Sequence, residues 1–188
     1  MTTGSDSKQA ATGHISDEDF QDAFNRVELY IESRYGIPVS ISDVLDPNSG
    51  DFDGASIKVD YDQDLEVALF VLIHLFGHTV QWNLSDTLRR LGVDSKPGKS
   101  DDELRQLYEY ERDATRYSLA LLHAVGVKHL DRWASDWWYA DWEYLQHFYR
   151  TGEKLEVRKL LRPGDGDTLT PLAIPAFSPQ RWISRWSF

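Results

Sequence analysis

The chain has 188 residues, of which 41% are hydrophobic, and its formal net charge is −11 at pH 7. This length suits one globular domain with a sizeable core. The acidic balance argues against a phosphate-binding surface, so nucleic acid is not expected as a direct partner. The sequence contains no cysteine, which excludes disulfides and thiolate metal sites and leaves His, Asp, Glu and water as metal ligands.

The N-terminal residues differ in character from the rest of the chain. Residues 1–15 predict a flexible leader, and residues 16–188 predict a single domain. The leader is polar and lacks the apolar segment of a signal peptide, and no stretch approaches the roughly 20 apolar residues of a membrane span. We therefore expect a soluble, cytoplasmic protein without a membrane partner.

Hydrophobic periodicity predicts three long helices. Capping boxes begin the first at Ser16 and the third at Ser100, and Gly36 ends the first. The second helix is apolar on nearly all sides, which indicates that other elements enclose it. The helices are expected at about 16–35, 64–82 and 100–125.

Short strands lie between the first two helices. Apolar residues alternate at 37–41 and 57–61 with turn sequences between them, so two or three strands are expected. Residues 91–99 read as a connection. The predicted fold class is therefore α+β, mostly helical, with a small mixed or antiparallel sheet.

The last third of the chain predicts an aromatic-rich, helical C-terminal extension of the same domain. Residues 128–150 form a helix with too many aromatic side chains for one buried stripe, so two of its faces should be covered. Pro179 is expected to open a short helix that carries Trp182 and Trp186 on one side. This pair would hold the C-terminal segment against the body of the domain.

Two histidines occupy one face of the second helix. His74 and His78 are four residues apart, so both project from the same side, as two ligands of one tetrahedral metal must. In the third helix Glu111 lies in a row of apolar residues and should point inward. A carboxylate on an apolar face costs several kcal/mol unless it is paired or binds a metal. A His2Glu zinc site completed by water accounts for all three residues.

Other interpretations of these residues stay open. His74 and His78 would also fit a core in which each imidazole is hydrogen-bonded to backbone carbonyls or hydroxyls. Glu111 would also fit a buried ion pair with a basic residue. In that case the chain is a metal-free helical module for protein interaction or regulation.

The segment Ile73-His74-Leu75-Phe76-Gly77-His78, followed by the segment Glu111 to Leu122 in the third helix, resembles the ImmA/IrrE family of zincin-like metallopeptidases. That family pairs an H-E-x-G-H helix with a later E-x-x-A-x-x-F-A-x-x-L-L helix, whose positions are filled here by Glu111, Ala114, Tyr117, Leu121 and Leu122. The resemblance covers residues 20–126 and implies zinc held by His74, His78 and Glu111, a peptide or protein as partner, and close approach of another element at Gly77.

The sequence departs from that family at Leu75, where the family has its general-base glutamate. Leucine cannot accept a proton, and loss of a general base costs on the order of 10²–10⁴ in rate. The catalytic residue is therefore unknown. Substitute candidates are Asp113, Tyr117 as a hydrogen-bond donor, and the acids of residues 51–62, although each also reads as a surface charge or a packing residue. The chain is thus a zinc metallopeptidase-like protein that is either a pseudopeptidase or a hydrolase with another base.

Overall fold

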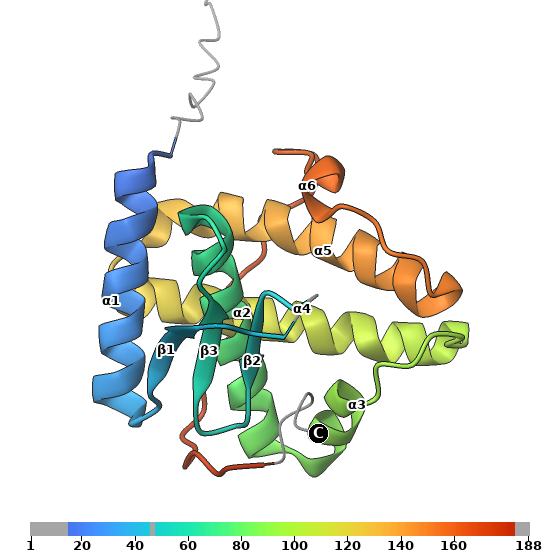
Figure 1. Ribbon diagram of the computed structural model, residues 1–188, viewed down its shortest axis with the longest axis horizontal. Coiled ribbons are helices and arrows are strands. Elements are labelled where there is room, and N and C mark those ends of the chain that lie inside the picture. The colour runs from blue at the N-terminus through green and yellow to red at the C-terminus, as the bar shows by residue number, and fades with distance from the viewer. Residues whose placement is uncertain (1–14, 46–47, 183–188) are drawn as a thin grey trace, which may run out of the picture.

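The computed structural model describes residues 15–45 and 48–182, so the predicted leader lies, apart from Ile15, outside the described residues. The elements in chain order are α1 (Asp17–Tyr35), β1 (Val39–Ser42), β2 (Gly50–Phe52), β3 (Ile57–Asp60), α2 (Leu65–Leu84), α3 (Asp86–Val93), α4 (Asp101–Ala124), a 3-10 turn (Lys128–Leu130), α5 (Asp131–Thr151) and α6 (Val157–Leu160). Figure 1 shows the sheet in front of α2, α1 along one side, and α4 and α5 side by side.

The α+β, mostly helical fold with a small sheet is confirmed, and the sheet is mixed. Its order is β1-β3-β2. The outer strand β1 pairs with β3 in parallel, whereas β2 pairs with β3 antiparallel and places Gly50 opposite Val59. Within the described residues β2 is an edge strand of this sheet, and it also contacts α2.

The predicted helix starts are confirmed in atomic detail. The side chains of Ser16 and Ser100 each accept a hydrogen bond from the backbone N–H three residues later, and their own backbone N–H groups donate to the carboxylates of Asp19 and Glu103. Gly36 ends α1 in the left-handed conformation at φ 67°, which only glycine adopts without strain. Residues 86–93, in contrast, form α3, so the connection expected from residue 91 begins later than predicted.

The central helix of the core is α2. It contacts α1, α4, β2 and β3, and its side chains that are at most 1% exposed include Leu69, Leu72, Ile73, Phe76 and Val80. By length and composition α2 is apolar enough to cross a membrane, contrary to the expectation from the sequence, but 72% of that stretch is buried inside the protein. Such burial is what the core helix of a soluble protein shows.

The crossing of α2 and α4 brings two backbones together. A Cβ atom on Gly77 would lie 2.2 Å from the carbonyl oxygen of Ala114, so only glycine fits at this point. One turn further along, Ser118 donates a hydrogen bond of 2.7 Å to the carbonyl of Ile73. This close approach was expected at Gly77, and it fixes the relative position of the two helices that carry the predicted metal ligands.

The segment after α5 returns over α4 and α5, as the aromatic composition of α5 predicted. The backbone N–H of Leu169 donates to Ser135 of α5, and that of Leu172 donates to the carbonyl of Arg116 on α4. Gly166 lies so close to the ring of Tyr139 that a Cβ there would be 2.2 Å from Cε2. A second face of α5 is therefore covered by the chain itself.

The helix predicted from Pro179 is wrong for the residues that can be described, since residues 178–182 have no helical structure. Trp182 nevertheless attaches this segment to the rest of the domain. Its backbone N–H donates to the carbonyl of Asp53, and the guanidinium of Arg89 lies 3.7 Å from its ring centroid. Trp186, its predicted companion, lies outside the described residues. Backbone pairing and a cation–π contact, rather than a helix, attach this segment.

Candidate metal centre

The structure brings together the three predicted ligands from α2 and α4. Nε2 of His74 lies 3.2 Å and Nε2 of His78 3.0 Å from the same carboxylate oxygen, Oε2 of Glu111. The two Nε2 atoms are 2.9 Å apart. The side chains of His74, His78 and Glu111 are 12%, 8% and 8% exposed, so the cluster is nearly removed from solvent.

The tautomer of His78 is set by Gln81 and the carbonyl of Tyr110. The amide nitrogen of Gln81 donates to the carbonyl of Tyr110 at 2.7 Å, which turns the amide oxygen of Gln81 toward His78. That oxygen can only accept, so Nδ1 of His78, 2.9 Å away, carries the proton and donates it. In the neutral imidazole Nε2 therefore presents a lone pair to Glu111 and His74.

A cation between the two Nε2 atoms and Oε2 of Glu111 would satisfy all three atoms at once. In a tetrahedral zinc site, bonds of about 2.0–2.1 Å place ligand atoms about 3.3 Å apart. The observed separations of 2.9, 3.0 and 3.2 Å differ from this by a few tenths of an ångström. The donor set and its spacing therefore fit zinc, and these three residues form the metal-ligand group that the described part of the chain contains.

The charge balance within the group points the same way. Burial by itself would raise the pKa of Glu111, but the positive charge of a protonated His78 and hydrogen bonds from both histidines outweigh burial, so the pKa lies well below its usual range. The carboxylate is thus ionised, and it attracts a cation whether that cation is a proton on an imidazole or a metal ion.

Aromatic rings hold the two imidazoles in orientation. His74 stacks on Phe70 with centroids 5.5 Å apart, and His78 lies between Tyr110 at 4.6 Å and Phe52 at 5.9 Å. These contacts restrict ring rotation, so the ligand atoms are arranged in advance. Nδ1 of His74 differs from that of His78, because it is buried without a hydrogen-bond partner among the described residues.

The cluster opens into a cavity of about 340 Å³ between β2, α2, α4 and α5. Leu75 lines it beside the three candidate ligands, so the position at which the H-E-x-G-H pattern has its glutamate does border the cavity. A Cβ on Gly50 would lie 2.8 Å from Cδ1 of Leu75, which shows how tightly this side chain packs under the edge strand β2. The cavity wall at this point is apolar.

The candidate bases named from the sequence lie in different places. Among the described residues that line the cavity, neither Asp113 nor Tyr117 occurs. Asp113 accepts from Arg112 and Arg116 on the outside of α4, and Tyr117 packs against the core, where burial raises its pKa. Of the acids in residues 51–62, Asp51 reaches the cavity.

A carboxylate that the sequence reading missed also lines the cavity. Asp141 of α5 is half-buried there, together with His74 and Glu111. Burial raises its pKa to about 6, because the opposing attraction of His74 is partly cancelled by repulsion from Glu111. The sequence does contain a pattern that indicates Asp141. Trp133, Trp137 and Asp141 follow one another at four-residue spacing, so this acid lies on the same helical face as two buried tryptophans.

Comparisons of the chain with protein-family models, with curated proteins and with solved structures give no match. The similarity to the ImmA/IrrE family therefore stays a prediction that rests on the motif residues quoted above. The His2Glu geometry and the cavity are properties of this chain itself.

Proposed function

We propose that this protein is a soluble, cytoplasmic, zinc-dependent protein of metallopeptidase type. The observation that carries the proposal is the convergence of Nε2 of His74, Nε2 of His78 and Oε2 of Glu111 on one buried point, with the tautomer of His78 fixed by Gln81. A zinc ion at this point would supply Lewis acidity to a substrate carbonyl and lower the pKa of water. The ligands come from two helices locked at Gly77, so the site is formed before metal binds.

The cavity supports a peptide or protein as the partner of this centre. It is open to solvent, is bordered by the edge strand β2, and has an apolar wall that includes Phe70, Leu145 and Phe148. Such a lining buries side chains, and the backbone of the edge strand β2 lies beside them. With Leu75 at the usual base position, hydrolysis requires a carboxylate from another element.

Elemental analysis of protein purified without added metal tests the proposal. We expect about one zinc per chain in the parent protein and loss of zinc in His74→Ala, His78→Ala and Glu111→Gln, with a lower thermal midpoint because bound metal stabilises the fold. His123→Ala is the matched control, since His123 pairs with Asp131 away from the cavity. Equal metal content in parent and ligand variants would contradict the proposal and favour the metal-free interaction module.

A second experiment separates an enzyme from a pseudopeptidase. Leu75→Glu restores the carboxylate at the family's base position, facing the same cavity. If peptide hydrolysis appears in the variant and not in the parent, the natural protein is a pseudopeptidase that keeps its metal. Hydrolysis by the parent itself means that another side chain supplies the base.

A further inference from the structure

One wall of the cavity is built by α5, and the first half of this helix is attached to α2 by specific contacts. The indole N–H groups of Trp133 and Trp137 both donate to Oε1 of Glu66, at 2.9 and 3.0 Å. One turn further along α2, Phe70 stacks on Trp137 with centroids 5.2 Å apart. These contacts hold the first half of α5 against the N-terminal half of α2.

One more turn on each helix leads to the metal centre. Four residues after Phe70 comes His74, and four residues after Trp137 comes Asp141. Both line the cavity, and Asp141 experiences the charges of both His74 and Glu111. The aromatic pairs before it fix the position of Asp141 through the helix and not through a flexible loop.

Asp141 faces the centre without belonging to its ligand group. The donor atoms of His74, His78 and Glu111 all lie within 4.8 Å of one another, and Asp141 is not part of that group. Within the described part of the chain its carboxylate has no hydrogen bond or ion pair, in contrast to Glu111. A half-buried carboxylate without a partner, at the open side of a metal-binding cluster, is placed to act on a molecule in the cavity.

We propose that Asp141 is the acid–base residue of the metal centre and replaces the carboxylate absent at Leu75. This inference rests on the proposed function, because it assigns the proton transfer that a zinc hydrolase of this kind needs. During hydrolysis of a peptide bond, an oxygen of Asp141 takes a proton from water as the new C–O bond forms. The same oxygen returns the proton to the amide nitrogen as the C–N bond breaks, which yields one carboxyl and one amine product.

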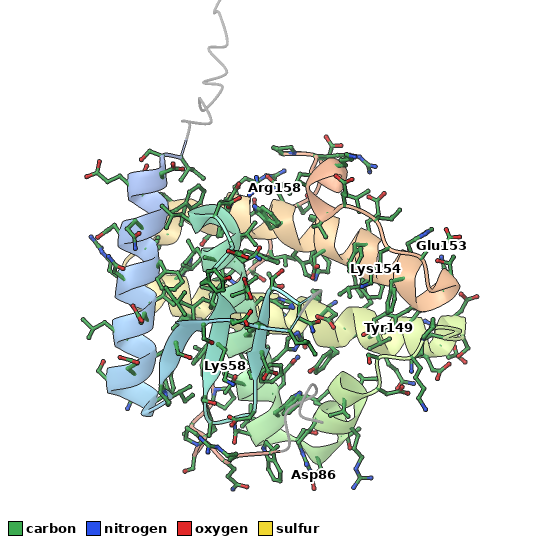
Figure 2. All side chains as sticks on the ribbon, in the orientation of Figure 1. Lys58, Asp86, Tyr149, Glu153, Lys154 and Arg158 are labelled. Atoms are coloured by element: carbon green, nitrogen blue, oxygen red, sulfur yellow. The ribbon has the colours of Figure 1, made fainter. Side chains whose placement is uncertain are left out.

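The surroundings of Asp141 suit a residue that must both take and release a proton. In the metal-free protein burial raises its pKa to about 6, and the charge of a bound cation would favour the ionised form that accepts a proton from water. Its neighbour Tyr144 in turn has a pKa raised by burial and by the charge of Asp141. Other titratable groups share the cavity with Asp141: His74 and His78 of α2, Glu111 of α4, Asp51 of β2, Tyr144 and Tyr149 of α5, and Lys154 after α5. Figure 2 labels Tyr149 and Lys154.

The test uses Co²⁺ as a spectroscopic probe in the full chain. Parent, Asp141→Asn and Glu143→Gln proteins, each with one equivalent of Co²⁺, are titrated between about pH 5 and 9 while visible absorption is recorded. We expect all three proteins to bind Co²⁺. The inflection of the curve of absorption against pH should differ from that of the parent, by about one pH unit or more, in the Asp141→Asn protein alone. Glu143 is the matched control because it is an acid on the same helix that pairs with Arg162 on the outside.

Activity provides the second readout. Peptide hydrolysis by Asp141→Asn is expected to fall by about 10²–10⁴, and Asp141→Glu is expected to recover part of the rate because it restores a carboxylate. Circular dichroism of each variant shows that the fold is retained. If the parent hydrolyses none of the peptides offered, the spectroscopic titration alone decides the role of Asp141.

The outcomes that overturn the inference are distinct from those that overturn the proposed function. Loss of Co²⁺ from Asp141→Asn would make Asp141 a ligand, and an unchanged titration would make it a bystander; either result refutes the acid–base role while the metal centre stands. A parent protein that holds neither zinc nor Co²⁺ refutes the proposed function first, and the role of Asp141 with it. Elemental analysis of the parent reveals this before any Asp141 variant is measured.

Discussion

The two sides of the cavity are built in contrasting ways. On the side of the α2–α4 crossing, backbones touch at Gly77 and the polar groups of Gln81, Ser118 and Glu111 are all engaged. On the α5 side, aromatic rings line the cavity, and the carboxylate of Asp141 has no hydrogen bond or ion pair among the described residues. The difference teaches that the rigid side is built to hold three potential ligands in place, whereas the proposed acid–base residue belongs to the aromatic side.

The largest effect is expected where the backbones touch. Gly77→Ala places a Cβ 2.2 Å from the carbonyl oxygen of Ala114, so α2 and α4 must separate. We expect a loss of about 3 kcal/mol or more in the free energy of unfolding, because overpacking against backbone cannot be relieved by a rotamer change. Urea denaturation followed by circular dichroism measures it. An unchanged midpoint would show that the crossing is looser than the structure indicates.

The next effect concerns the residue that orients His78. Gln81→Ala removes the acceptor for Nδ1 of His78 and leaves the carbonyl of Tyr110 without its donor. Zinc affinity is expected to fall by about 10–100-fold, as for other partners of metal-binding histidines. Competition with a chromophoric chelator measures the affinity. Asn83→Ala is a useful control, since Asn83 lies on the same helix and bonds to Gly54 and Gln180 instead.

A smaller effect, of opposite sign, is expected at Asp141 in the metal-free protein. The pKa of this acid is raised to about 6 in the fold, so its charged form is penalised above that pH and the penalty disappears below the ordinary value of 3.8. Asp141→Asn should therefore stabilise the metal-free protein at pH 8, by about 2 kcal/mol, and leave it unchanged at pH 3.5. Thermal melts at the two pH values, with chelator present, provide the measurement. Destabilisation at pH 8 would mean that the carboxylate has a partner in solution.

The smallest effect is expected on the outer face of α4. Asp113→Asn weakens exposed ion pairs with Arg112 and Arg116, which contribute about 0–1 kcal/mol each. Metal content and any hydrolytic rate should equal those of the parent. A fall in rate would restore Asp113 as the base that the sequence suggested and would count against Asp141.

The sequence anticipated the metal centre better than the rest of the cavity. His74, His78 and Glu111 stood out because histidine pairs and a lone acid interrupt apolar helical faces, and that conflict is visible in the letters alone. Asp141 interrupts its aromatic row in the same way, but it was overlooked because nothing in the sequence showed which element α5 faces. The helix predicted after Pro179 failed because tertiary pairing of Trp182 with Asp53 overrode a local turn signal.

What the sequence by itself determined is local: the capped helix starts, the apolar α2, the α+β class and the inward direction of each ligand. These follow from periodicity and from capping, which act over a few residues. Only the tertiary structure decided that two helices meet at Gly77, that three acceptor atoms converge within about 3 Å, and that α5 completes the cavity with Asp141. Such distances depend on how side chains from remote segments pack together, and no short-range pattern encodes them.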